Sequence, residues 1–227
     1  TAAGEPVASM CVLGTFSPYV TVHQSSVVKI EKDIPLDKAA LLGCGVATGW
    51  GSATEIGGAK EGDVVVVVGI GGIGINSVQG AAAAGARAIV AVDPVEFKRE
   101  KAMEFGATHT CNSMDEAMAL VGEISWGRMA DLVILTMGVV NGNDLLPGLT
   151  LTGKGRRCVV VGLGDMMAVD AQISILDLAM QQKTLQGAIF GGTGPRKQIP
   201  HLLHQYRAGN LKLDELVTKT YRLEEIN

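Results

Sequence analysis

Long apolar runs separated by glycine-containing turns dominate the middle of the chain. Residues 64–68 are five successive valines, a run that suits a strand covered on both faces of a parallel sheet. Residues 73–84 are rich in alanine and predict a helix. The uncharged stretch 64–86 is long enough to cross a bilayer, but its six glycines and its Asn, Ser and Gln residues are atypical of a span. We therefore predict a strand, a glycine turn and a helix of a globular domain.

The same alternation continues toward the C-terminus. Apolar runs at 88–92, 130–136 and 157–161 predict three further strands, and segments 97–105 and 141–151 predict helices between them. Strands that alternate with helices indicate βαβ units and a parallel sheet. The similar runs "VVVVVGIGG" and "CVVVGLGD" indicate two mononucleotide-binding halves. The predicted fold class is therefore α/β, a doubly wound parallel sheet of the Rossmann type.

The glycine spacing after the first strand indicates a dinucleotide site. In "GIGGIG", Gly69 allows a tight turn, Gly71 lets a pyrophosphate approach the backbone, and Gly74 lets the helix pack on the strand. The start of the helix then offers unpaired N–H groups to the phosphates. Because other nucleotide-binding proteins use similar turns, this motif alone does not define the ligand.

An acidic residue ends the next strand and narrows the choice of ligand. Asp93 follows the glycines by about twenty residues, the position from which a carboxylate accepts hydrogen bonds from an adenosine ribose and disfavours a 2′-phosphate. This favours NAD over NADP. The alternative is that Asp93 caps a helix before Pro94. Lys98 is either a surface charge of that helix or a side chain that reaches the ribose.

Charge and cysteine spacing exclude several other classes. The formal net charge is −4 without a basic run, so we expect no nucleic-acid partner. The cysteines lack a CxxC spacing, which argues against a disulfide framework or a structural zinc knuckle and favours a reducing, cytoplasmic location. We expect no membrane association. Because the chain begins with Thr1 rather than methionine, it is interpreted as processed or truncated. The four cysteines are Cys11, Cys44, Cys111 and Cys158.

Several longer stretches resemble one enzyme family. "LLGCGVATGWGSA" (residues 41–53), "GIGGIG" and "AVDPVEFKREKAMEFGATH" resemble the zinc-dependent medium-chain alcohol dehydrogenases, and the resemblance extends through residues 14–30 and 184–192. The combination of "GIGGIGINSVQGAA" with "AVDPVEFKRE" is most similar to the actinobacterial branch that includes nicotinoproteins, which keep their cofactor bound. The resemblance implies an NAD-dependent oxidoreductase that transfers hydride between an alcohol or aldehyde and nicotinamide at a catalytic zinc. The alternative is a non-catalytic dinucleotide-binding fragment or sensor.

The resemblance also implies roles for individual residues. Cys44 matches a ligand of the catalytic zinc, and Thr48 matches a catalytic residue beside the nicotinamide; without the motif, Cys44 would be interpreted as an inert core residue. Ile73 matches a position behind the nicotinamide ring, and Phe16 matches an edge of the substrate cleft. For the apolar positions, simple core packing is the alternative. The remaining cofactor-side positions are Gly72, Val161, Gly162, Leu163 and Phe190.

The family pattern is incomplete in this sequence. The resemblance implies a further cysteine and a histidine as zinc ligands, from a domain preceding Thr1, and Cys44 by itself does not hold zinc tightly. We therefore expect residues 1–45 to be the end of a catalytic domain, 46–190 the NAD-binding domain, and 191–227 a truncated return segment. The chain alone is expected to be inactive.

Two further expectations concern the histidines and self-association. His201 and His204 are predicted to lie on a surface helix rather than to bind metal, while His23, in the strand-like "VTVHQ", and His109 are predicted to be structural. Segment 175–190 combines an apolar helix with an apolar strand that would form a sheet edge. This favours a homodimer or higher homo-oligomer, unless another part of the same protein covers that edge.

Overall fold

The computed structural model describes Gly4 and residues 19–225. The chain divides into two compact units, Thr1–Asp33 and Ile34–Asn227. In the first unit, a short 3₁₀ turn, Gln24–Ser26, follows His23, whose Nδ1 accepts a hydrogen bond from the backbone N–H of Ser25 at 3.2 Å. The segment around His23 is strand-like in sequence, but residues 20–22 form no strand with any other described residue.

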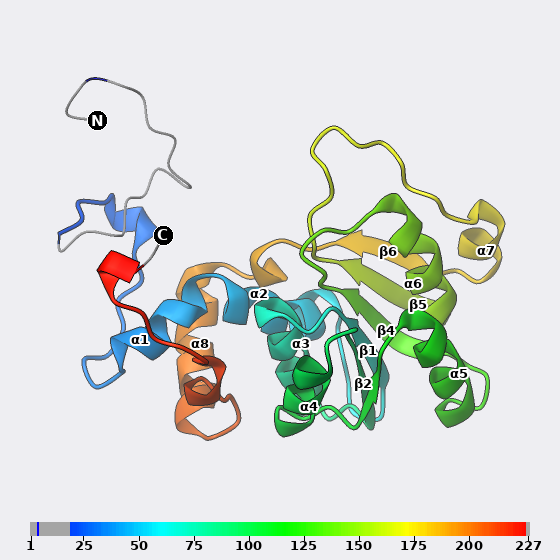
Figure 1. The fold of residues 1–227 in the computed structure, drawn as a ribbon, viewed down its shortest axis with the longest axis horizontal. Coiled ribbons are helices and arrows are strands. Elements are labelled where there is room, and N and C mark those ends of the chain that lie inside the picture. Colours follow the sequence, from blue (N-terminus) through cyan, green and yellow to red (C-terminus); the bar gives the residue numbers. More distant parts are fainter. Residues whose placement is uncertain (1–3, 5–18, 226–227) are drawn as a thin grey trace. The chain divides into compact units, whose positions relative to one another are not determined.

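The second unit is built on a six-stranded sheet in which every neighbouring pair of strands is parallel (Figure 1). The strand order is β3-β2-β1-β4-β5-β6, so the chain moves outward from β1 to one edge and then from β4 to the other. This is the doubly wound order of dinucleotide-binding folds, and it confirms the predicted fold class. The strands are β1 (Val64–Val68), β2 (Ala88–Val92), β3 (His109–Cys111), β4 (Ala130–Leu135), β5 (Thr152–Val160) and β6 (Thr184–Gly187).

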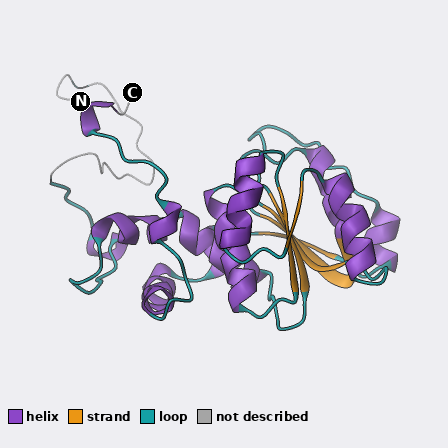
Figure 2. Cartoon of the chain, turned by 60° about the horizontal axis from the view of Figure 1, so that its bottom comes forward, coloured by secondary structure: helices purple, strands orange, loops and turns teal. Residues whose placement is uncertain are grey.

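Helices cover both faces of the sheet, as Figure 2 shows. α3 and α4 contribute to the apolar cluster on one face, and α5 and α6 to the cluster on the other. The helices are α1 (Leu36–Ala39), α2 (Gly45–Gly51), α3 (Gly72–Ala83), α4 (Glu96–Glu104), α5 (Met114–Ile124), α6 (Leu145–Leu151), α7 (Ile175–Met180) and α8 (Pro195–Arg207).

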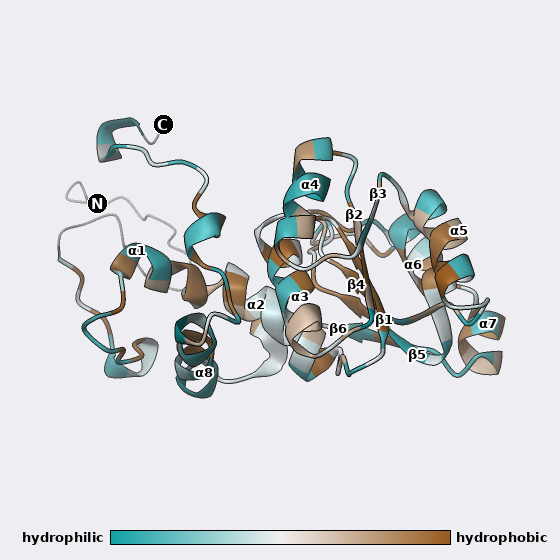
Figure 3. Ribbon diagram, turned by 90° about the horizontal axis from the view of Figure 1, so that it is seen from below, coloured by the Kyte–Doolittle hydropathy of each residue, from teal (hydrophilic) through white to brown (hydrophobic). Residues whose placement is uncertain are grey.

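The five-valine run forms the centre of the core. Val65 and Val67 belong to the apolar cluster on one face of β1, while Val64, Val66 and Val68 belong to the cluster on the other. Successive side chains of a strand point to opposite faces, so a strand with helices on both sides needs apolar residues throughout. Figure 3 shows the hydrophobic colour along the central strands.

Two predicted segments differ in detail from the structure. The strand expected at 157–161 is β5, which begins earlier, at Thr152, and the helix expected at 141–151 is a 3₁₀ turn, Gly142–Asp144, followed by α6. The sequence analysis also missed β3 and α5. β3 has only three residues, too few to show an alternating pattern, and two of them are partly exposed.

Among the described residues, no helix has both the length and the hydropathy needed to cross a bilayer.

Candidate functional site

The glycine turn after β1 has the geometry that its spacing predicts. Gly69 has a φ of +90°, in the region that favours glycine, and a Cβ there would come within 2.7 Å of the Met137 backbone nitrogen. A Cβ on Gly74 would overlap the Gly69 carbonyl oxygen. These two glycines therefore allow the turn itself to form and α3 to lie against it.

Gly71 and Gly72 leave the opposite side of the turn open. A Cβ on either residue would meet no heavy atom within 4 Å. Gly71 is the N-cap of α3 and offers no capping side chain, and no described residue accepts a hydrogen bond from the N–H groups of Gly72, Ile73 or Gly74. Free N–H groups at the start of a twelve-residue helix form an anion-binding position, so the turn is suited to a phosphate group.

Asp93 lies beside this turn at the carboxyl end of β2. Its side chain is only 4% exposed, and its Oδ2 accepts a hydrogen bond from the Ile70 N–H at 2.8 Å. Oδ1 accepts from the Val95 N–H at 2.9 Å, and the Lys98 ammonium lies 3.4 Å from Oδ2. The N-cap of α4 is Val95 rather than Asp93, so the alternative interpretation of Asp93 as the helix cap was wrong. The carboxylate instead connects the end of β2 to the turn.

A pocket of about 550 Å³ lies next to the turn, within the usual range for small-molecule sites. It brings together four of the predicted site residues, which are Cys44, Gly71, Gly72 and Lys98. Ile70, Ile75, Phe97 and Phe105 supply apolar surface to the same pocket. The pocket therefore combines an open glycine turn, a basic side chain and a thiol.

Helix α2 places Thr48 close to the start of α3. Thr48 is buried, and a Cβ on the next residue, Gly49, would overlap the Ile73 carbonyl oxygen. The Ser77 hydroxyl donates to the Gly49 carbonyl at 3.0 Å. On the other side of α2, Gln198 from α8 donates to the Ala47 carbonyl at 2.8 Å. The position of Thr48 relative to Ile73 thus depends on direct backbone contact between two helices.

The remaining residues predicted to lie beside the cofactor follow β5 in the sequence. Val161 is buried in the core, whereas Leu163 is 75% exposed, and its carbonyl accepts a hydrogen bond from the Val140 N–H at 3.1 Å. A Cβ on Gly162 would overlap the Met137 carbonyl oxygen. Phe190 follows β6 and is half-exposed, with a φ of +47°. Phe16, predicted at the edge of the substrate cleft, lies outside the described residues.

Three residues that support the site were missed by sequence reasoning. Thr136 follows β4, and its hydroxyl lies 2.6 Å from the Gly69 carbonyl and 2.9 Å from the Val68 carbonyl, so it supports the glycine turn from the neighbouring strand. Ser77 and Gln198 support α2 as described above. Each of these bonds joins a side chain to a backbone group far away in the sequence, and no local motif indicates such a contact.

The described residues do not assemble a metal site. Within Gly4 and residues 19–225, no three His, Cys, Asp or Glu side chains lie close enough together to hold an ion. Cys44 is exposed and unpaired, so it is available as a single thiolate ligand. His201 and His204 are exposed on α8, in agreement with their predicted surface position.

Comparisons with known proteins give matches over most of the chain. Residues 72–207 match the family model described as zinc-binding dehydrogenase. The chain is 50% identical, over 99% of its length, to an NDMA-dependent alcohol dehydrogenase of Amycolatopsis methanolica, and 46% identical, over its whole length, to alcohol dehydrogenase B of Mycobacterium tuberculosis. It spans 60% of the length of each of these relatives.

Among solved structures, benzyl alcohol dehydrogenase from Acinetobacter calcoaceticus is similar, with a TM-score of 0.82 and 32% sequence identity. The match covers 88% of this chain and 54% of that chain.

Proposed function

Since the chain belongs to the zinc-binding dehydrogenase family, we propose that the complete protein is an alcohol dehydrogenase that transfers hydride between an alcohol or aldehyde and NAD. The observation that carries this proposal is the open glycine turn, where N–H groups without acceptors among the described residues lie beside the buried Asp93 carboxylate. The named activities of the relatives support it, and the chain spans 60% of their length.

The choice of NAD rests on Asp93. Oδ2 already accepts from the Ile70 N–H and from Lys98, whereas Oδ1 accepts only from the Val95 N–H and retains a lone pair that can accept from a ribose hydroxyl. Lys98 offsets part of the negative charge, but the carboxylate still disfavours a second anion at this position. The turn would bind the pyrophosphate, with Gly71 and Gly72 leaving room for its oxygens.

The proposed nicotinamide end lies toward α2 and the ends of β5 and β6. Thr48 would orient the reacting groups, Ile73 would lie behind the ring, and Val161, Gly162, Leu163 and Phe190 would line its further side. A nicotinamide bound there supplies the hydride acceptor or donor. The buried position of Thr48 in the α2 and α3 contact supports this, because catalysis requires rigidly held orienting groups.

Cys44 is proposed as one ligand of a catalytic zinc, whose role is to polarise the alcohol oxygen. A single thiolate does not hold zinc tightly, so this proposal requires ligands outside the described residues. The division into residues 1–45, 46–190 and 191–227 remains part of the same proposal. A cytoplasmic location is also proposed, supported by the free thiols of Cys44, Cys111 and Cys158.

We also propose self-association through β6 and α7. β6 is an edge strand, and Ile175, Leu176 and Met180 of α7 are each more than two-thirds exposed. An edge strand beside exposed apolar side chains is suited to pairing with a second copy.

Zinc content and turnover in the complete protein test the central proposal. We expect about one catalytic zinc for each subunit and formation of reduced nicotinamide that depends on added alcohol, with a single-turnover assay if the cofactor stays bound. Stoichiometric NAD binding without zinc and without turnover would instead establish the non-catalytic sensor.

A further inference from the structure

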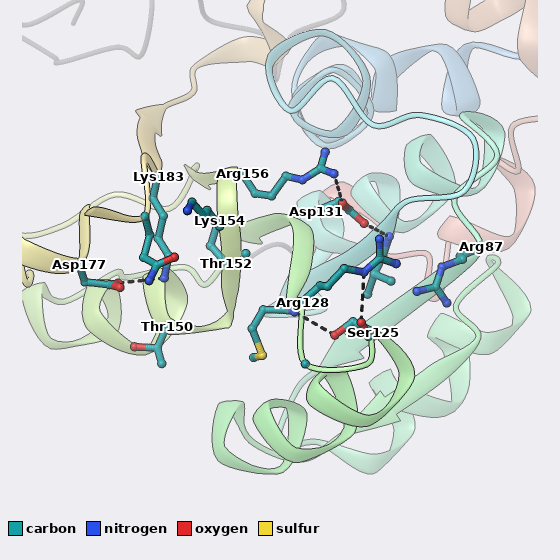
Figure 4. Close-up of a pocket in the computed structure, with 15 residues that line it drawn as sticks. Arg87, Ser125, Arg128, Asp131, Thr150, Thr152, Lys154, Arg156, Asp177 and Lys183 are labelled. Carbon is teal, nitrogen blue, oxygen red and sulfur yellow. Dashed lines mark hydrogen bonds and ion pairs between the residues drawn. The ribbon is translucent and has the colours of Figure 1, made fainter. Parts of the chain in front are cut away.

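We infer that the amino-terminal edge of the sheet carries a second binding site, for a small phosphate-bearing anion. A pocket of about 490 Å³ lies at this edge (Figure 4). Five neighbouring strands bring residues to it. Arg87 and Lys183 directly precede β2 and β6, and Val64 begins β1. Asp131 lies near the start of β4, and Arg156 lies within β5. The glycine turn lies at the opposite, carboxyl ends of these strands, and the two pockets share no lining residue.

Basic side chains dominate this amino-edge pocket. Five of them line it, against two carboxylates, in a chain whose formal net charge is −4. The positive charge is therefore concentrated here against the overall balance of the protein. The basic residues are Arg87, Arg128, Lys154, Arg156 and Lys183, and the acidic residues are Asp131 and Asp177.

Both carboxylates are already paired. Asp131 lies 2.9 Å from the Arg156 guanidinium through Oδ1 and accepts a hydrogen bond from the Val64 N–H at 2.8 Å through Oδ2. Asp177 lies 2.9 Å from the Lys183 ammonium. Two of the five cations are thus balanced. Arg87, Arg128 and Lys154 form no ion pair with any other described residue.

The partial negative charge at the C-terminal end of α5 offsets only part of the positive charge of Arg87 and Arg128. Arg87 Nη2 donates to the Ile124 carbonyl at 3.1 Å, and Arg128 Nε donates to the Ser125 carbonyl at 3.3 Å. Basic groups stabilise a helix C-terminus, which carries roughly half a negative charge. Two full positive charges exceed that amount, and each guanidinium has further N–H donors.

An aromatic ring helps to hold the two arginines in place. The guanidinium carbons of Arg87 and Arg128 lie 5.7 Å and 5.8 Å from the centre of the Trp126 ring, within the range of cation–π attraction. Trp126 itself is 81% exposed. Because the ring already restricts the conformations of both arginine side chains, less conformational entropy is lost when a ligand binds.

The chemistry of the pocket selects a compact, multiply charged anion. Guanidinium groups match phosphate oxygens in pairs, and Lys154 adds a point charge. The hydroxyls of Thr150 and Thr152 are within bonding distance of the Leu146 and Gly148 carbonyls, so charge rather than hydroxyl donation would dominate recognition. The pocket is larger than a phosphate group alone. We therefore assign it to the phosphate or pyrophosphate end of a small organic molecule.

The test is a titration of this chain with inorganic pyrophosphate, followed by amide and indole NMR. The chain has two tryptophans, and buried Trp50 lies in α2 while Trp126 marks the amino-edge pocket. We expect saturable shifts of the Trp126 indole and the Gly153 amide that persist when NAD is present in excess. Shifts confined to the Gly71 amide, shifts abolished by NAD, or no saturable shift would overturn the inference.

Charge-removing variants complete the test. Lys154→Gln removes a cation that forms no ion pair with another described residue. Lys154→Gln combined with Arg87→Gln should weaken pyrophosphate binding by about tenfold or more. The matched control, Lys197→Gln combined with Lys219→Gln, removes the same charge from exposed positions outside the pocket and should leave the affinity unchanged. If Arg87→Gln unfolds the chain, the single Lys154→Gln variant still decides the question. Equal loss in variant and control would show general charge attraction and overturn the site.

Discussion

The Asp93 carboxylate accepts a hydrogen bond from the Ile70 N–H at 2.8 Å, and this bond joins the end of β2 to the glycine turn after β1. Ile70 lies between the two glycines that shape the turn. One buried side chain therefore supports the turn and also presents negative charge beside it. A substitution that keeps the hydrogen bond but removes the charge separates these two roles.

Asp93→Asn is that substitution. The asparagine carbonyl oxygen can still accept from Ile70, its amide nitrogen replaces the oxygen that accepts from Val95, and the charge that disfavours a 2′-phosphate is removed. We expect the preference for NAD over NADP, measured as the ratio of dissociation constants, to fall by about tenfold or more, in line with the energy of a charged hydrogen bond. Glu96→Gln removes an exposed charge from the first turn of α4 and should leave the ratio unchanged. An unchanged ratio in Asp93→Asn would show that another group selects the cofactor.

Gly71→Ala should weaken NAD binding, whereas Gly74→Ala should destabilise the fold. A Cβ on Gly71 meets open space and its φ of −92° suits alanine, so the fold should be kept while the methyl group occupies the proposed phosphate position. We expect an affinity for NAD lower by about tenfold or more with unchanged thermal stability. A Cβ on Gly74 overlaps the Gly69 carbonyl, so Gly74→Ala should destabilise the chain by about 1–3 kcal/mol. Normal NAD binding by a folded Gly71→Ala variant would contradict the proposed cofactor position.

Alkaline pH should destabilise the fold through Cys158. Burial raises the pKa of this thiol from 9.0 to about 12, so the unfolded chain loses the proton at a lower pH than the folded one. The free energy of unfolding should therefore fall as pH rises from about 9 toward 12, by up to about 1.4 kcal/mol for each pH unit.

Urea unfolding at a series of pH values measures this slope. Cys158→Ala should reduce the dependence of the free energy of unfolding on pH. The dependence that remains is expected from the thiol of Cys111, because burial raises its pKa to about 11. The same slope in Cys158→Ala would refute the assignment to this thiol.

Ile175→Asp should disrupt the proposed self-association. Ile175 is 69% exposed on α7, so the substitution should change the stability of the chain by no more than about 0.5 kcal/mol. A charge in an apolar contact between copies is unfavourable, and we expect sedimentation to show a shift from dimer to monomer. Leu36→Asp, at an exposed apolar position on α1, serves as the control and should remain dimeric. Sedimentation of the unmodified chain as a monomer would contradict the interface.

Much of the fold could be predicted because its signals are local. The valine run of β1 and the alanine-rich α3 each carry their own pattern, and the glycines between them have a spacing that only a tight strand-to-helix turn requires. The short β3 and the early part of β5 were missed or misplaced, since their lengths depend on the partner strand rather than on their own residues.

The hydrogen bonds that support the site could not be predicted, because they join residues far apart in the sequence. Thr136 reaches Gly69 across 67 positions, and Gln198 reaches Ala47 across 151, so each bond exists only because strand order and helix packing bring the two backbones together. The amino-edge pocket likewise draws on the starts of five strands. Residue order alone specified β1, α3 and the glycine turn between them, since these depend on neighbours in the chain. Folding in three dimensions decided which distant side chains meet, because that depends on how the sheet is wound.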